Sequence, residues 1–98
     1  MEFEWNKRKV EENIKKHKGV GFNEATLAFY DKWAIEEFHD AHSDSSEKRF
    51  VIIGWSINRL LRVIYTIREN ELIRIISAEI ARPFEERAYN ENRNEYDR

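Results

Sequence analysis

The N-terminal part of the chain shows the alternation of a strand and then the spacing of a helix. Residues 2–5 place aromatic and acidic side chains in turn, which predicts a short strand. A helix is expected over about 7–17, because one face repeats at helical spacing there; that face consists of Val10, Ile14 and His17. Asn6 is placed to cap this helix and Gly19 to end it, since glycine accepts the left-handed conformation.

The middle of the chain predicts a second helix, two strands and a loop. The helix is expected over about 23–31, with a buried stripe of Ala25, Ala28 and Phe29. Aromatic and β-branched residues at 33–38 predict a strand, and residues 39–48 form a polar loop without a period. Residues 49–56 are apolar on both faces, so this strand is expected in the centre of the sheet, with its turn at 57–59.

Two alternating segments, 60–68 and 72–80, predict a hairpin whose register decides where the arginines lie. A two-residue turn would bring Arg74 onto the apolar face. A three-residue turn pairs residue 68 with 72 and residue 66 with 74, and it needs a left-handed residue at Asn70 or Glu71. Because burying an unpaired arginine is costly, the three-residue turn is favoured.

The favoured register produces one charged and one apolar face. The charged face, called the arginine face below, carries Arg62, Arg68 and Arg74. The apolar face carries Leu61, Val63, Tyr65, Ile67, Ile73 and Ile75. Strict alternation then places Ser77 on the apolar side and Ala78 on the side of Arg74.

A last helix is expected over about 83–92, because proline suits the first turn of a helix. The charged residues 91–98 are expected to fray. The predicted order is β-α-α-β-β-β-β-α. It indicates a single α+β domain over residues 1–98, with a mainly antiparallel sheet and the helices mostly on one face.

Composition narrows the class of protein. The 98 residues include 13% aromatic side chains, three Gly and one Pro, which argues against a disordered or linker-like chain. The chain has no cysteine, which excludes disulfides, cysteine zinc sites and thiol nucleophiles. No apolar run reaches the roughly 18 residues of a membrane span, and the N-terminus is acidic where a signal peptide is basic. A cytoplasmic location is therefore expected.

The net charge of −2 hides an uneven distribution. Residues 49–82 carry six arginines and three acids, whereas residues 19–48 carry two basic and seven acidic side chains. An acidic chain is a poor general binder of nucleic acid, because affinity for phosphates grows with the number of cations engaged. The arginine face is still suited to binding a few phosphates, and the alternative is a solvated strand face.

Several kinds of catalytic site do not fit the sequence. It contains neither the G-x-S-x-G turn of a serine nucleophile nor a glycine-rich phosphate loop. His39 and His42 lie near Asp40 and Asp44, but their spacing matches no closed metal motif. A solvated loop is favoured there, and no metal or other cofactor is expected.

The arginines suit phosphate chemistry better. Guanidinium groups bind phosphate through two hydrogen bonds and stabilise the charge of a phosphorane-like transition state. RNA cleaves itself when its 2′-hydroxyl is deprotonated in line with the phosphorus, which requires positioning, an acid and a base but no metal. The candidate proton carriers are His17, His42, Glu47, Glu85 and Tyr89. Each has a structural alternative, such as helix capping for His17, pairing with Arg49 for Glu47, or a core position for Tyr89.

An ordered set of short motifs resembles the BrnT family of toxins from bacterial and archaeal type II toxin–antitoxin pairs, over about residues 2–90. The chain opens with F-E-W-N-K-R-K-V-E-E-N-I-K-K-H-K-G-V-G-F-N-E-A and continues with F-Y-D, E-x-R, R-I-I-S-A and E-x-R-x-Y. The resemblance implies a RelE/ParE-like α+β fold and a metal-independent endoribonuclease that cuts RNA to arrest growth.

The resemblance also implies partners and site residues. The partner is a BrnA-like antitoxin with a ribbon-helix-helix part, and operator DNA is bound only through the complex of the two proteins. The expected assembly is a homodimer or a toxin–antitoxin heterotetramer, and no membrane takes part. Together with the arginine face, it suggests the candidate catalytic residues Arg74, Arg49, Glu47, Tyr89 and His17. The candidate RNA-binding residues are Arg62, Arg68, Arg82, Arg87 and Lys16.

Three positions depart from the family pattern. Asn6 stands where the family often has Asp, Lys18 is inserted before Gly19, and Glu79 stands where the family usually has Arg. An acid at position 79 weakens phosphate binding, although Arg82 is a substitute cation. The alternative function is therefore a catalytically weakened module that binds an antitoxin and modulates operon repression. A third hypothesis is an unrelated structural domain that dimerises through exposed aromatic residues.

Overall fold

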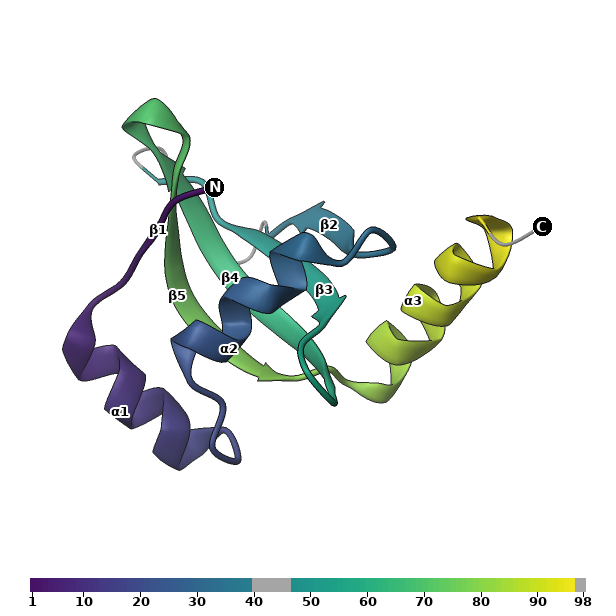
Figure 1. Ribbon diagram of the computed structural model, residues 1–98, viewed down its shortest axis with the longest axis horizontal. Helices are drawn as coiled ribbons and strands as arrows, with labels where there is room; N and C mark the ends of the chain where they lie inside the picture. The colour runs from purple at the N-terminus through teal and green to yellow at the C-terminus, as the bar shows by residue number, and fades with distance from the viewer. Residues whose placement is uncertain (40–46, 97–98) are drawn as a thin grey trace.

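One five-stranded sheet forms the centre of the molecule, with its strands in the order β1-β5-β4-β3-β2 (Figure 1). The computed structural model describes residues 1–39 and 47–96. The strands are β1 Phe3–Glu4, β2 Ile35–Phe38, β3 Phe50–Trp55, β4 Leu60–Arg68 and β5 Leu72–Ile80. Neighbouring strands are antiparallel, except that β1 lies parallel to β5. The α+β class and the mainly antiparallel sheet agree with the sequence prediction.

The helices follow the predicted order with different bounds. They are α1 Lys7–Lys16, α2 Phe22–Thr26, the 3-10 helix η1 Leu27–Tyr30, the 3-10 turn η3 Glu69–Glu71 and α3 Pro83–Tyr96. The predicted second helix is thus two short helices, and α3 continues beyond the predicted end near 92. The fraying of 91–98 stays a prediction. The candidate metal residues Asp40, His42 and Asp44 lie outside the described residues.

The strand predicted at 33–38 is shorter than expected, because Asp31 closes a turn before it. The Trp33 amide donates to Asp31 Oδ1 over 3.0 Å, and the Ala34 amide donates to the Asp31 carbonyl over 3.1 Å. These two hydrogen bonds hold Trp33 and Ala34 outside the ladder, so β2 begins only at Ile35.

The main core lies between the sheet and the two short helices α2 and η1, which cross its front in Figure 1. Ala25 and Ala28 are fully buried there, as the helical stripe predicts. Gly54 of β3 permits this close approach, since a Cβ at that position would lie 2.6 Å from the Ala28 carbonyl oxygen. The cluster comprises Val20, Phe22, Ala25, Ala28, Ile52, Leu61, Val63, Tyr65, Ile75 and Ala78.

Helix α3 packs against the opposite face of the sheet. Tyr89 of α3 forms a second buried cluster with Val51, Ile53 and Leu60. These residues alternate along β3 and β4 with those of the main core, so they point the other way. The expectation that the helices gather mostly on one face is wrong for α3. The expectation that β3 is buried on both faces is confirmed, but it is an interior strand next to β2, and the centre of the sheet is β4.

The β4–β5 hairpin has the predicted three-residue turn and register. Arg68 pairs with Leu72 and Thr66 with Arg74, and both Asn70 and Glu71 have a φ of 61°. Further along, Tyr65 pairs with Ile75 but Ile64 pairs with Ser77, so Ile76 is an extra residue in β5. Such a bulge reverses the alternation beyond it.

The bulge corrects the predicted faces of the end of β5. Ala78 belongs to the main core and is 1% exposed, whereas Ser77 is half-buried on the other side. Glu79 consequently lies directly opposite Arg62 on the arginine face. Strict alternation could not anticipate this reversal, because one extra residue shifts every following side chain to the other face.

Helix α1 is capped by Asn6, as predicted, through a 2.9 Å hydrogen bond from the Arg8 amide. Its buried residue is Asn13, whereas Ile14, predicted to be buried, is 41% exposed. The Asn13 amide group donates to the carbonyls of Val20 and Ala78, and its Oδ1 accepts from the Ala78 amide. Asn13 therefore takes the place of a neighbouring strand at the open edge of β5, where β1 has already ended.

We expect Asn13→Ala to lower the free energy of unfolding by about 2–4 kcal/mol, because it leaves buried backbone groups of Ala78 and Val20 without partners. Chemical denaturation followed by circular dichroism measures this loss. Asn90→Ala removes an exposed amide from α3 and is the matched control. Equal stability of the two variants would show that the Asn13 contacts contribute no stability.

A candidate anion site at the hairpin end of the sheet

On the arginine face, β5 and the end of β4 at Arg68 are accessible to solvent, whereas Leu60, Arg62 and Thr66 of β4 are buried. Helix α3 packs Tyr89 against Leu60 on this face. Arg62, Arg68 and Arg74 lie on this face, as the register predicts. They do not form one group. Arg62 pairs with Glu79 at one end of the hairpin, and Arg68 and Arg74 lie at the other end, near the turn. Along β4, Arg62 lies four residues from Thr66, the partner of Arg74, and six residues from Arg68, which is about 13 Å and about 20 Å at roughly 3.3 Å per residue.

The group near the turn is called the hairpin-end site and consists of Glu4, Glu47, Arg49, Arg68 and Arg74. Arg68 Nε lies 3.2 Å from Glu4 Oε1, and Arg74 Nη1 lies 3.3 Å from the same oxygen. Arg49 Nε donates to Glu47 Oε1 over 2.9 Å. The structure therefore brings together four residues that the sequence analysis selected, and adds Glu4.

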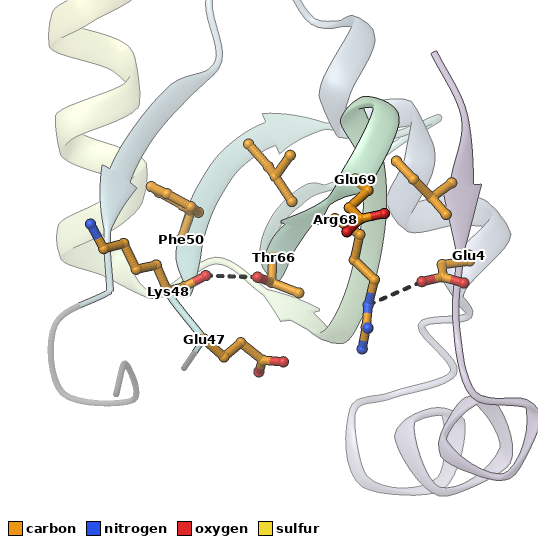
Figure 2. A pocket seen from close by; sticks show the side chains of 9 residues that line it. Glu4, Glu47, Lys48, Phe50, Thr66, Arg68 and Glu69 are labelled. Carbon is orange, nitrogen blue, oxygen red and sulfur yellow. Dashed lines mark hydrogen bonds and ion pairs between the residues drawn. The ribbon is translucent and has the colours of Figure 1, made fainter. Parts of the chain in front are cut away.

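An open groove of about 880 Å³ runs through this site. Figure 2 shows Glu4 and Arg68 on one side of the groove and Glu47 on the other, while the Lys48 amino group points away from Arg68. The Thr66 hydroxyl donates to the Lys48 carbonyl over 2.8 Å and so ties the 47–49 segment to β4. The groove is lined by Glu4, Glu47, Lys48, Phe50, Thr66, Ile67, Arg68, Glu69 and Leu72.

The cations of the hairpin-end site are accessible to solvent. The side chains of Arg74 and Arg49 are 29% and 31% exposed, and that of Arg68 is 50% exposed. Exposed ion pairs contribute little stability, since water screens them and ordering long side chains costs entropy. These arginines can therefore exchange a carboxylate partner for a phosphate at small cost, and the site is suited to binding an anion.

The opposite end of the hairpin holds a second group, called the far-end cluster: His17, Arg62, Glu79, Arg82 and Glu85. Glu79 contacts one histidine and two arginines, at 3.2 Å from His17 Nδ1 and at 3.3 Å from Arg62 and from Arg82. The acid at position 79 thus pairs with the substitute cation Arg82 and also contacts two further candidate residues, Arg62 and His17. Glu85, a candidate proton carrier, is buried in this cluster.

Arg62 is the buried centre of the far-end cluster. It is 8% exposed, and its Nε donates to Glu85 Oε2 over 2.9 Å. The other Glu85 oxygen accepts from the Arg82 amide at the start of α3, over 2.9 Å. Arg62 therefore anchors α3 to β4, and its guanidinium has little surface left for a phosphate.

Tyr89 is placed in the core rather than in a groove. It is 1% exposed, and its hydroxyl donates to Asp31 Oδ2 over 2.6 Å. Burial, together with the Asp31 carboxylate, raises the pKa of Tyr89 well above its ordinary value. Asp31 also accepts from the Trp55 amide over 2.9 Å, so the pair joins α3 to β3. This geometry agrees with the core position that the sequence analysis gave as the structural alternative for Tyr89.

The remaining candidates lie on the surface or outside the site. Lys16 at the end of α1 and Arg87 on α3 are exposed.

Arg59, in the β3–β4 turn, donates to both Glu24 oxygens and to the Lys18 carbonyl, and it lowers the pKa of Glu24. This ion pair holds the end of α1 against α2 and belongs to the fold.

Sequence reasoning missed two residues that contact candidate residues, Asp31 beside Tyr89 and Glu4 beside Arg68 and Arg74. Asp31 stood in the quoted F-Y-D motif, but its three hydrogen bonds reach residues up to 58 positions away. Glu4 stood in the predicted first strand, and nothing in that strand indicates that it lies beside β5.

Among residues 1–39 and 47–96, no three His, Asp or Glu side chains are grouped as metal ligands. No helix in these ranges is long and apolar enough to cross a membrane.

The model of the BrnT family, described as the ribonuclease toxin BrnT of type II toxin–antitoxin systems, matches residues 5–85. This match defines the class of this protein, a toxin of a type II toxin–antitoxin system. The chain therefore belongs to the BrnT family of ribonuclease toxins. Arg87 and Tyr89 lie beyond the matched residues.

A solved structure supports the fold. The 1.1 Å crystal structure of the ribonuclease toxin BrnT from Brucella abortus is similar, with a TM-score of 0.62 and 21% sequence identity. The match covers 84% of this chain and 97% of that one. No curated protein sequence matches the chain well enough to count as a relative.

We expect Glu85→Ala to lower the free energy of unfolding by about 3 kcal/mol, because it leaves the buried Arg62 guanidinium without its closest partner and removes the cap of α3. Thermal or urea unfolding measures the change. Glu86→Ala, one residue further along the same first turn and exposed, is the control and should change stability by less than about 1 kcal/mol. A Glu85→Ala variant as stable as Glu86→Ala would disprove the anchoring role of Arg62.

Proposed function

We propose that this protein is a metal-independent endoribonuclease toxin that cleaves RNA to arrest growth. One observation carries the proposal beyond membership of the family: two arginines of adjacent strands converge on a single carboxylate oxygen, across a groove from a second carboxylate, Glu47. Such an arrangement suits a phosphodiester, because guanidinium groups bind phosphate oxygens and stabilise the charge that grows on them.

The proposed reaction is transesterification within the RNA. The 2′-oxygen forms a bond to the adjacent phosphorus, and the bond from phosphorus to the 5′-oxygen breaks. A base takes the proton of the 2′-hydroxyl, and the 5′-oxygen receives a proton as it leaves. The products are a 2′,3′-cyclic phosphate and a free 5′-hydroxyl. No metal is needed if arginines supply the charge that the non-bridging oxygens require.

The geometry suggests a role for four of the five residues of the hairpin-end site. Arg74 and Arg68 bind the non-bridging oxygens of the scissile phosphate. Glu47 is the general base, held in place by Arg49 at 2.9 Å. The 5′-oxygen takes its proton from water, since the groove is open to solvent.

Residues away from the hairpin-end site take other roles in the proposal. His17, Lys16, Arg82 and Arg87 bind RNA beyond the scissile phosphate, along the arginine face and its far end. The buried residues Arg62 and Tyr89 position α3 and make no contact with RNA.

The proposed partner is a BrnA-like antitoxin with a ribbon-helix-helix part. A segment with acidic and apolar residues would complement the arginine face and block the groove. The toxin would then meet operator DNA only through the complex, for which we propose a toxin–antitoxin heterotetramer, in the cytoplasm.

Induced expression of the chain alone in a bacterium should arrest growth and degrade RNA, and co-expression of the antitoxin should prevent both. The purified protein should cut RNA in the presence of EDTA.

We expect Arg74→Ala to lower the cleavage rate by about a hundredfold or more, because an arginine that stabilises transition-state charge is removed. Arg8→Ala, an exposed arginine of α1, is the matched control. Equal cleavage by Arg74→Ala, with its fold intact, would refute the assignment.

A second function is favoured by Glu79. This acid pairs with both Arg62 and Arg82 and contacts His17, so the far end of the face presents less positive charge to RNA. A toxin weakened in this way would act mainly as a binding module, which holds the antitoxin and modulates operon repression.

Glu79→Gln tests the second function without placing a new cation against the buried Arg62, as Glu79→Arg would. We expect RNA cleavage to rise by about two- to fivefold, because removing one acid strengthens phosphate binding. The rates of wild type and variant are compared on the same RNA, with the exposed Glu91→Gln as control. Cleavage that appears only in Glu79→Gln would establish the binding module; no gain over Glu91→Gln would exclude a weakening role for Glu79.

A further inference from the structure

Glu4 faces two arginines with one carboxylate oxygen, as Glu79 does at the other end of the hairpin. A single oxygen, Oε1, receives both Arg68 Nε at 3.2 Å and Arg74 Nη1 at 3.3 Å. The two arginines come from adjacent strands, β4 and β5, and their guanidinium groups converge on this one point. A non-bridging phosphate oxygen at this point would form ion pairs with the same two guanidinium groups.

The backbone of Glu4 is fixed, whereas its carboxylate is not enclosed. Strand β1 pairs Glu4 with Arg74, and the Ile73 amide donates to the Glu2 carbonyl over 3.0 Å. The Glu4 side chain is 35% exposed and lines the open groove. Rotation of this side chain alone therefore vacates the point between the two arginines, with no movement of the sheet.

We propose that the Glu4 carboxylate occupies the position of an RNA phosphate oxygen, and that it competes with the phosphodiester for Arg68 and Arg74. In the free protein, Glu4 keeps the two guanidinium groups converged. On binding, the phosphate displaces it. The identity of the ligand rests on the proposed function, whereas the anion position rests on the geometry. Glu4 thereby sets the affinity of this subsite.

The contact between Glu4 and the arginines is weak enough for such an exchange. Arg68 is exposed and Glu4 and Arg74 are partly exposed, so water reaches and screens both pairs. A phosphate also offers more oxygens to the two guanidinium groups than one shared carboxylate oxygen does. Removal of the competing carboxylate should therefore strengthen phosphate binding, although the negative charge also helps to orient the arginines.

The test is the affinity for a short single-stranded RNA with 2′-O-methyl groups, which the protein cannot cleave. We expect Glu4→Gln to bind this RNA about two- to fivefold more tightly than the wild type, measured by fluorescence anisotropy. Glu2→Gln removes the same charge two residues earlier and should change the affinity by less than about twofold. Glu4→Asp keeps the charge but shortens the reach, so its affinity should lie between wild type and Glu4→Gln. Unfolding curves of each variant establish that it is folded.

A second set of variants separates displacement from a general charge effect. In a protein that carries Arg68→Gln and Arg74→Gln, the added change Glu4→Gln should strengthen binding no more than Glu2→Gln does. If the gain persists in that background, or if Glu4→Gln alone binds no more tightly than Glu2→Gln, the competition is refuted. Weaker binding by Glu4→Gln would also refute it, because Glu4 would then support the arginines in the bound state.

Inorganic phosphate distinguishes failure of this inference from failure of the proposed function. If wild-type protein neither cuts nor binds RNA, the proposed function fails, and the anion position is decided by the shift in unfolding midpoint that phosphate produces. A larger shift in Glu4→Gln than in Glu2→Gln supports the position between Arg68 and Arg74. Equal shifts in the two variants overturn it.

Discussion

The extra residue in β5 is the constraint on which the rest of the structure depends. Because Ile76 bulges out of the ladder, Ala78 turns toward the main core and Glu79 turns toward Arg62. Without the bulge, the acid would point into the apolar core, and the buried guanidinium would lose one of its two carboxylate partners. A buried cation is tolerated only when such partners surround it. The bulge therefore makes the far-end cluster possible, and that cluster determines where α3 begins.

This constraint divides the arginines of one face into two kinds. Arg62 is buried and holds β4, β5 and α3 together, whereas Arg68 and Arg74 remain accessible near the hairpin turn. A basic strand face in a sequence is thus not by itself a measure of the charge available to a ligand. Each internal carboxylate removes part of that charge, and in this chain Glu79 does so at one end of the face and Glu4 at the other.

Side chains that replace backbone partners support the same arrangement. Asn13 bonds both backbone groups of Ala78 where no strand flanks β5, and Asp31 joins the turn before β2 to β3 and α3. Both are short polar residues whose geometry suits backbone groups. Asn13 and Tyr89 stand in the sequence motifs that resemble the family, yet both make buried hydrogen bonds that hold the fold together. Part of that sequence signature therefore reflects structural contacts.

The sequence by itself determined the α+β class, the strands and helices, the three-residue turn and the sharing of one face by three arginines. These features follow from local periodicity, turn chemistry and the cost of burying an unpaired charge. Only the tertiary structure decided that Glu79 faces Arg62, that Tyr89 is buried against Asp31, and that Glu4 lies between Arg68 and Arg74. A bulge leaves no signal in alternation, and contacts between residues some 60 positions apart depend on how whole elements pack. The candidate site was therefore visible in the sequence as a set of residue types, whereas its division into an accessible end and a buried end required the fold.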